Sequence, residues 1–229
     1  MELIKAININ KSYINMEVVT QALRGINLSV EEGEFVSIMG PSGCGKSTLL
    51  NLLGLLDTPS EGALFFMGKD CSSISARKRA YYRRAYIGFV FQSFNLIEEL
   101  TLFENIELPL LYQRIAPKER KERVMQVLER LQLLHKKDFY PGQVSGGQQQ
   151  RAAVARAVVS RPRLILADEP TGNLDSGQGQ EVMELLMQLN ELGTTIIMAT
   201  HSKSAANYSH RVIHLFDGEI VTENLIQKG

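Results

Sequence analysis

Long apolar runs, an excess of one charge and a cysteine pattern are all missing from this 229-residue chain. The longest apolar stretch, around Leu49 to Leu56, contains Asn51 and Gly54 and is far shorter than the roughly 18–20 residues that span a bilayer. The formal net charge is zero, which argues against the positive field of a nucleic-acid-binding protein. Its two cysteines, Cys44 and Cys71, show neither metal-ligand spacing nor a disulfide framework.

Residues 1–10 lack the basic start and long apolar segment of a signal peptide. A hydrophobic content of 44% with 22% charged residues is ordinary for a globular protein. We therefore expect a cytoplasmic protein that binds no nucleic acid and reaches a membrane only through a partner. No internal repeat or low-complexity linker is visible, so the sequence predicts a single domain over residues 1–229.

Short apolar runs flanked by turn residues alternate with helical periodicity, which predicts an α/β fold with a mostly parallel central sheet. The strands expected in this sheet are Phe35–Met39, Ile87–Phe91, Leu164–Ala167, Thr194–Ala199 and Arg211–Phe216. A helix is expected over Lys46–Leu55, directly after the first of them.

Two further regions differ from this alternation. Leu3–Tyr13 and Gly25–Val30 predict a smaller antiparallel layer, and Asp217-Gly218 predicts a tight turn into a hairpin. Residues 94–143 predict a helical subdomain inserted in the α/β core, with a helix that starts at Pro117. Its apolar face would carry Val124, Val127, Leu128, Leu131 and Leu134.

The segment Gly40 to Ser47 fits the pattern G-x-x-x-x-G-K-[ST] and lies between an expected strand and an expected helix. Glycines let backbone N–H groups turn toward phosphate oxygens, and the helix N-terminus adds a favourable dipole. Lys46 would contact the β- and γ-phosphates, and the Ser47 hydroxyl would ligate Mg²⁺. Cys44 within the loop is either a small filler residue or a thiol made reactive by the helix N-terminus.

The run Leu164-Ile-Leu-Ala-Asp168 predicts a buried strand that carries a carboxylate to the edge of the sheet. There Asp168 could hold Mg²⁺ near the phosphate loop. The next residue, Glu169, could act on the attacking water as general base or orienting group, or else serve as a helix cap or surface ion pair.

The segment Val144-Ser-Gly-Gly-Gln-Gln-Gln-Arg151 precedes an apolar helical run. Ser145 is a suitable N-cap, and the two glycines that follow permit close backbone approach at a helix start that favours an anion. Taken alone, the segment is as consistent with plain helix capping.

These three segments, in this order, resemble the ATP-binding cassette (ABC) ATPases, and the resemblance covers essentially the whole chain. It implies a P-loop ABC fold and hydrolysis of ATP with Mg²⁺. It also implies that Val144–Arg151 contacts the γ-phosphate bound to the opposite subunit of a homodimer, so that the site is complete only in the dimer. A separately encoded membrane permease would be the second partner.

Other motifs match the family residue by residue. Gln92 resembles the Q-loop glutamine, His201 the switch histidine, Asn173–Asp175 the D-loop, and Tyr13 the aromatic residue that stacks on adenine. The catalytic residues implied are Glu169, His201 and Gln92, and the metal contacts are Ser47, Gln92 and Asp168. The nucleotide contacts implied are Tyr13, Gly40, Ser42, Gly43, Cys44, Gly45, Lys46, Ser47, Thr48, Ser145, Gly146, Gly147, Gln148 and Asp175.

The sequence around these motifs looks like the branch of the MacB, LolD and FtsE ATPases. Val144, Ser202 and Cys44 depart from the family pattern without removing a catalytic group, although Ser202 bears on how His201 is oriented. We expect the ATP-hydrolysing subunit of an efflux or lipoprotein-release transporter. A regulatory ATPase of cell-wall remodelling that transports nothing, and a soluble ABC protein of another process, are the alternatives.

Five of the eight residues from Arg77 to Arg84 are basic, and Tyr81 and Tyr82 lie among them. A solvated helix face is the simplest interpretation. Contact with anionic lipid headgroups or with the membrane partner is the functional alternative.

Overall fold

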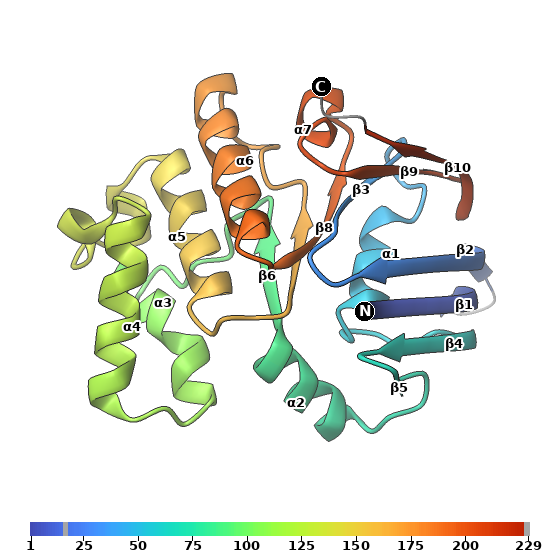
Figure 1. Cartoon of the computed structure of the whole chain (residues 1–229), viewed down its shortest axis with the longest axis horizontal. Coiled ribbons are helices and arrows are strands. Elements are labelled where there is room, and N and C mark those ends of the chain that lie inside the picture. Colours follow the sequence, from blue (N-terminus) through green and yellow to red (C-terminus); the bar gives the residue numbers. More distant parts are fainter. Residues whose placement is uncertain (16–17, 227–229) are drawn as a thin grey trace.

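The computed structural model describes residues 1–15 and 18–226 and contains two sheets (Figure 1). The larger sheet has the strand order β10-β9-β3-β8-β7-β6, and all neighbours except β10 and β9 run parallel. Its strands are β3 (Phe35–Met39), β6 (Ile87–Phe91), β7 (Leu164–Asp168), β8 (Thr195–Thr200), β9 (Arg211–Phe216) and β10 (Glu219–Leu225). The predicted α/β fold with a mostly parallel sheet is confirmed.

The turn between β9 and β10 also agrees with its prediction. Asp217 and Gly218 have φ angles of 45° and 80°, so both central residues adopt the left-handed conformation that a tight hairpin turn requires. Glycine adopts this conformation without strain, and aspartate tolerates it better than most residues do.

The smaller sheet is antiparallel with the order β2-β1-β4-β5. Its strands are β1 (Glu2–Asn15), β2 (Val18–Glu31), β4 (Glu61–Phe66) and β5 (Lys69–Asp70). β2 starts well before the predicted Gly25, because pairing with β1 continues through Val18 even though Val19 is 64% exposed. The sequence did not predict β4 or β5.

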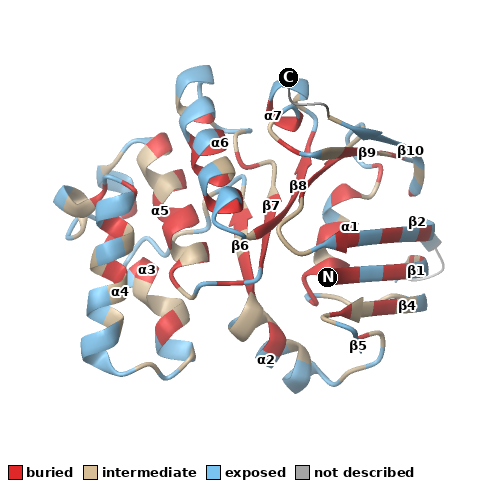
Figure 2. Cartoon of the chain, in the orientation of Figure 1, coloured by how far each residue is buried: buried red, intermediate tan, exposed pale blue. Residues whose placement is uncertain are grey.

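The central strands β3, β7 and β8 of the larger sheet are buried almost along their whole length (Figure 2). Along β7, Leu164 and Leu166 belong to one apolar cluster, and Ile165 and Ala167 belong to the other, because successive side chains of a strand point to opposite faces. The first cluster includes the smaller sheet and α1 (Lys46–Leu53). The second includes α5 (Gly146–Val158) and α6 (Ser176–Glu191).

Helices α3 (Leu102–Tyr112) and α4 (Pro117–Arg130) lie in the region where the sequence predicts a helical subdomain. They pack against each other and against α5 (Figure 1). Pro117 opens α4 as predicted, and Val124 and Leu128 are fully buried on its inner face. Short 3₁₀ turns follow at Leu134–Lys136 and Pro141–Gln143.

The remaining helices are α2 (Ala76–Tyr86), which carries the basic stretch, and the short α7 (Lys203–Ala206). On α2, Arg77, Lys78 and Arg84 are exposed, and Tyr82 is buried. Among the helices that the structure describes, none is long and apolar enough to cross a membrane.

Candidate nucleotide site

The loop from Gly40 to Gly45 joins the end of β3 to the start of α1. Gly45 has a φ angle of 105°, which strongly favours glycine. At Gly40 an added Cβ would lie 2.1 Å from the carbonyl oxygen of Leu215, so no larger residue fits there. Sequence and packing therefore both fix a tight loop whose amides meet the N-terminus of a helix, the geometry that suits a phosphate group.

Lys46 begins α1 and is 9% exposed. Its ammonium group donates hydrogen bonds to the carbonyl oxygens of Gly40 at 2.8 Å and Pro41 at 3.0 Å. The cation is thereby held along the inside of the loop, where it could exchange a carbonyl for a phosphate oxygen. A buried ammonium whose two hydrogen-bond acceptors are neutral carbonyl oxygens is well suited to an anionic ligand.

Asp168 ends β7 and faces Ser47 at the start of α1. The pKa of the Asp168 carboxyl is raised, mainly by burial and also by the nearby charge of Glu169. A hydrogen bond from Ser47 and the charge of Lys46 act in the opposite direction and offset only part of this shift. A carboxylate and a hydroxyl side by side offer the oxygen ligands that Mg²⁺ prefers.

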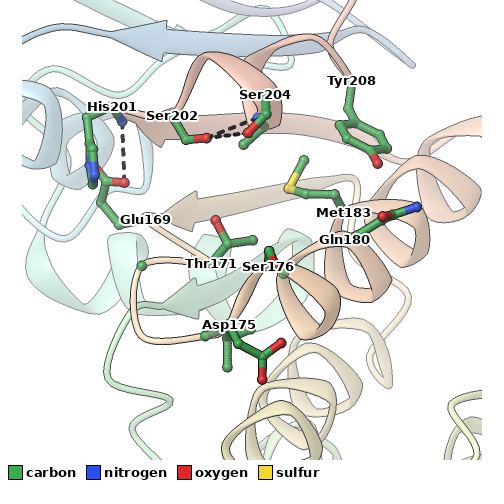
Figure 3. Close-up of a pocket in the computed structure, with 14 residues that line it drawn as sticks. Glu169, Thr171, Asp175, Ser176, Gln180, Met183, His201, Ser202, Ser204 and Tyr208 are labelled. Atoms are coloured by element: carbon green, nitrogen blue, oxygen red, sulfur yellow. Dashed lines mark hydrogen bonds and ion pairs between the residues drawn. The ribbon is translucent and has the colours of Figure 1, made fainter.

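Glu169 has a φ angle of 47°, an uncommon conformation for a residue with a side chain. Its backbone N–H donates to the carbonyl oxygen of Ala199 at 2.9 Å, which ties the strained residue to β8. One carboxylate oxygen lies 2.9 Å from Nδ1 of His201, and the other accepts the His201 backbone N–H at 3.4 Å (Figure 3). Two strand ends therefore hold this carboxylate in one orientation.

The pocket drawn in Figure 3 lies on one side of this pair, between the N-terminal end of α6 and α7. Hydroxyl groups of Thr171, Ser176, Ser202 and Ser204 line it. Ser202 caps α7 and lies 2.8 Å from the Ser204 hydroxyl, and so it does not orient His201. His201 is oriented by Glu169 instead.

Gln92 follows β6 and is tied to Asn173 by two reciprocal hydrogen bonds, each of 3.1 Å. The Gln92 side-chain amide donates to the Asn173 side-chain oxygen, and the Asn173 amide donates to the Gln92 backbone carbonyl. An added Cβ on Gly172 would lie 2.8 Å from the Gln92 side-chain nitrogen, so the Gln92 side chain would have to move to make room for it. The end of β6 and the segment after β7 are thus locked together.

A single cleft joins these groups on the other side of Glu169 and His201. The predicted site residues that line it are Ser42, Gly43, Gly45, Lys46, Ser47, Thr48, Gln92, Asp168, Glu169 and His201. They come from the phosphate loop and from the C-terminal ends of β6, β7 and β8, the edge where ligands bind in open parallel sheets. The arrangement can hold a phosphate chain, a divalent cation and a water molecule beside a carboxylate.

Three predicted contacts lie outside this lining. Gly40 faces Lys46 through its carbonyl oxygen. Cys44 is 5% exposed, and its burial favours the filler interpretation over the reactive thiol. Tyr13 is 42% exposed, and its hydroxyl donates to Asp57 at 3.2 Å.

The segment Val144–Arg151, which we call the signature segment, also lies apart from the cleft. Ser145 caps α5 and accepts a hydrogen bond from the Gln148 backbone N–H at 3.3 Å, while the Gln148 side chain reaches back to the Ser145 N–H. Gly147 packs closely on Gln178, and Asp175 caps α6 by accepting the Gln178 backbone N–H at 2.9 Å. Within one chain, these polar residues act as helix caps.

Residues that position the site were missed by the sequence reasoning. Gln150 is fully buried and its amide donates to the carbonyl oxygen of Pro170 at 2.5 Å. Arg156 donates to the carbonyl oxygens of Phe94 and Asn95, and burial lowers the pKa of its guanidinium group. Both residues lie on α5 and are six positions apart. Their partners are backbone carbonyl oxygens, which every residue has, so the sequence does not show which side chains will bind them.

The strand, phosphate loop, buried acid and glutamate–histidine pair together define a P-loop ATPase. The family model described as ABC transporter matches residues 23–172. An uncharacterized ABC transporter ATP-binding protein of Methanocaldococcus jannaschii is 52% identical over 219 residues, which cover 96% of this chain and 98% of the relative. The chain belongs to the ABC transporter family and is an ATP-hydrolysing member of it.

Solved structures agree with this assignment. The dimeric structure of MJ0796, described as a bacterial ABC transporter cassette, has a TM-score of 0.92 and 44% identity, covering 99% of this chain and 100% of that chain. A second dimeric structure of MJ0796, in a post-hydrolysis state bound to ADP and Pi, has a TM-score of 0.91 and 43% identity, with 99% and 100% covered. The predicted ABC ATPase fold is therefore confirmed.

A third relative is longer than this chain. The macrolide export ATP-binding/permease protein MacB of an Azoarcus species is 48% identical over 221 residues, which are 96% of this chain and 34% of that protein. The chain thus spans about a third of this relative. The match agrees with the predicted MacB, LolD and FtsE branch.

Proposed function

We propose that the chain binds ATP with Mg²⁺ in the cleft and hydrolyses it within a homodimer that drives a membrane permease. The single observation that carries the proposal is the gathering of the phosphate loop, Asp168, Glu169, Gln92 and His201 around one cleft. The chemistry of each group suits one part of a bound nucleotide or its metal ion. The MJ0796 dimer bound to ADP and Pi supports both the ligand and the assembly.

The residues at the cleft fit a magnesium ion. Asp168 and Ser47 are hydrogen-bonded neighbours with oxygen ligands, and Gln92 lines the same cleft. Mg²⁺ would neutralise charge on the β- and γ-phosphate oxygens. Because burial raises the pKa of Asp168, the site gains from a cation that keeps this carboxyl ionised.

Glu169 would orient and deprotonate the attacking water. Its carboxylate is held by His201, so the histidine would position the base and contact the γ-phosphate. The strained backbone of Glu169 agrees with a functional position, since such strain persists only where the surrounding structure imposes it.

The signature segment would serve the ATP of the partner subunit. Gly146 supports this role, because an added Cβ would meet its nearest neighbours at ordinary contact distances of 3.7 Å. Packing within the chain therefore does not require a glycine at this position. A phosphate approaching from a second subunit would require one. We propose that residues 94–143 form the helical subdomain that presents this segment.

A permease could dock on the groove between α2 and α3. This groove is lined by Tyr81, Pro109, Tyr112 and the basic residues Arg77, Arg83 and Arg84. Phe91 and Asn95 line both the groove and the nucleotide cleft, so a docked segment would touch the loop that carries Gln92. The permease portion named in the MacB relative supports this partner. The chain would then work at the cytoplasmic face of the membrane.

Glu169→Gln provides the test of the proposed function. The variant keeps the shape of the side chain but removes the carboxylate that handles water, so hydrolysis should fall by about a thousandfold while ATP binding remains. The variant should elute from a sizing column as a dimer with MgATP and as a monomer without it. Hydrolysis near the wild-type rate would contradict the proposal.

A further inference from the structure

Tyr13, Lys11 and Asp57 form a connected group of three side chains outside the phosphate cleft. Lys11 is 8% exposed and donates from Nζ to the Thr58 carbonyl oxygen and to Asp57 Oδ2, each at 2.8 Å. The Tyr13 hydroxyl donates to the same Asp57 oxygen at 3.2 Å, and the Lys11 ammonium lies 4.9 Å from the centre of the Tyr13 ring. The Tyr13 ring is therefore held by Asp57 at its hydroxyl end and by the Lys11 ammonium over one face.

Asp57 is itself fixed from several directions. Its second oxygen accepts the Thr58 backbone N–H at 2.7 Å. Burial alone would raise the pKa of Asp57, but hydrogen bonds from Lys11, Thr58 and Tyr13 outweigh burial and hold the pKa below its usual range. The carboxylate thus remains charged and gives Lys11 its counter-ion, as a nearly buried ammonium requires.

This group connects the smaller sheet to the helix that starts at the phosphate loop. Lys11 and Tyr13 belong to β1, whereas Asp57 and Thr58 follow the C-terminal end of α1. Both Asp57 and Leu56 donate backbone N–H groups to the carbonyl oxygen of Asn51, inside α1. The position of the Tyr13 ring is therefore tied to the same helix that places Lys46 in the cleft.

Tyr13 also lies at the cleft end of the two-stranded ribbon. It pairs with Thr20 across β1 and β2, and Ala22, two residues further along β2, lines the nucleotide cleft. Two residues of a strand span about 7 Å. An aromatic ring at this distance beyond the phosphate loop is placed for a nucleobase rather than for a phosphate. With 42% of Tyr13 exposed, a free ring would have to be ordered on binding.

We propose that Lys11 and Asp57 are positioning residues that hold the Tyr13 ring ready to stack on the base of ATP. The proposal rests on the proposed function, since it needs a nucleotide in the cleft. A ring fixed in advance loses little side-chain entropy when the base binds. The cation beside the ring also steadies it through the attraction between ammonium groups and aromatic faces. The pair then contributes to the affinity for the base and has no part in the phosphate chemistry.

The test compares the binding of MgATP with that of magnesium tripolyphosphate, which has no base, by titration calorimetry. Asp57→Asn should weaken MgATP binding about tenfold, because it removes a charge-assisted contact and the ring position that this contact fixes. Binding of tripolyphosphate should be unchanged. Tyr13→Phe keeps the ring and removes only its bond to Asp57, so it should weaken MgATP binding by about threefold.

Two further variants separate positioning from folding. Asp57→Asn leaves Lys11 buried without a counter-ion, whereas Lys11→Met combined with Asp57→Asn removes both charges and should show the same selective loss. Asp70→Asn is the matched control, because Asp70 lies in the sheet that holds Lys11 and Tyr13 and, among the described residues, its carboxylate bonds only to Ser72. Its binding of both ligands should equal that of the wild type.

The outcomes distinguish the two proposals. An equal loss for both ligands in the double variant, or no loss for either, would overturn the positioning role. Hydrolysis supports the role if KM for ATP rises while kcat stays within about twofold. If the wild-type chain binds neither ligand, the proposed function itself fails.

Discussion

The nucleotide cleft and the signature segment differ in how completely one chain builds them. At the cleft, groups from the phosphate loop and three strand ends converge, and their side chains hold one another in place. At the signature segment, Ser145 and Gln148 satisfy only their own helix start, and a Cβ added at Gly146 would meet its nearest neighbours at an ordinary contact distance of 3.7 Å. One region is a finished half-site. The other region, by the proposal above, faces the nucleotide of a partner subunit.

The glycines of the two regions differ in whether packing within the chain requires them. Gly40 and Gly45 are required by the chain itself, since a Cβ would lie 2.1 Å from Leu215 O at the first and 2.7 Å from Ala22 O at the second. Gly146 shows no such conflict and has no positive φ angle. We attribute the glycine at position 146 to the proposed partner subunit, and the following changes should separate the two regions.

The largest effect is expected for Lys46→Ala, which breaks the cleft. Removing the ammonium deletes charge-assisted bonds to the phosphates, so ATP affinity should fall by about a thousandfold. Calorimetry measures the loss directly. Lys69→Ala, which changes an exposed lysine of β5, is the control and should bind ATP normally. A Lys46→Ala protein that still dimerised on ATP would contradict the role given to this lysine.

Gly146→Asp should break only the signature segment. A carboxylate at this helix start would repel a γ-phosphate across the interface, so hydrolysis should fall by about a hundredfold. ATP binding to the monomer should stay within twofold of wild type, because the cleft is untouched. Gly146→Ala controls for folding, and both variants should have wild-type circular dichroism spectra. A hundredfold loss of monomer binding would place this segment in the chain's own site.

His201→Ala should impair the cleft without emptying it. The change frees the Glu169 carboxylate from its 2.9 Å contact, and hydrolysis should fall by about thirtyfold, as for loss of one charge-assisted hydrogen bond. ATP affinity should change much less than kcat. Steady-state kinetics provides both values, and His135→Ala, in the 3₁₀ turn Leu134–Lys136, is the control. Unchanged turnover would show that Glu169 needs no histidine.

The smallest effect is expected for Asn173→Ala. Loss of its two hydrogen bonds to Gln92 should loosen this side chain and lower the hydrolysis rate by about fivefold. Asn207→Ala changes an exposed asparagine just after α7 and should have no effect. Asn173→Ala therefore tests whether the contact between Gln92 at the cleft and the segment that precedes Asp175 contributes to hydrolysis. A rate equal to that of the Asn207 variant would show that the link is dispensable.

The sequence predicted the central sheet because its strands are continuous apolar runs. β7 and β8 are buried almost along their whole length, and such strands leave a clear signal. β4 alternates poorly and β5 has only two residues, so neither could be recognised. Val19, Thr20 and Gln21 of β2 have exposed side chains, and only pairing with β1 defines this part of the strand.

As with the fold, the sequence predicted part of the candidate site. Motifs identify the residues of the phosphate loop and the strand ends, because their order along the chain is distinctive. The pairs Glu169–His201 and Gln92–Asn173 could not be predicted, since each depends on side-chain rotamers and on how two strand ends lie in space. The same holds for the contact of Lys46 with its own loop and for the group around Tyr13.

Nucleotide trapping in a mixed dimer tests most directly whether the two regions serve opposite subunits. One chain carries Gly146→Asp, which disrupts its signature segment, together with Glu169→Gln, which blocks hydrolysis in its own cleft. The other chain carries Lys46→Ala, which prevents nucleotide binding in its own cleft but leaves its signature segment intact. The mixed dimer then contains one site made of two sound halves. The account predicts about one trapped ATP per mixed dimer and none in either homodimer. Efficient trapping by the homodimer of the Gly146→Asp, Glu169→Gln chain would show instead that each chain completes its own site.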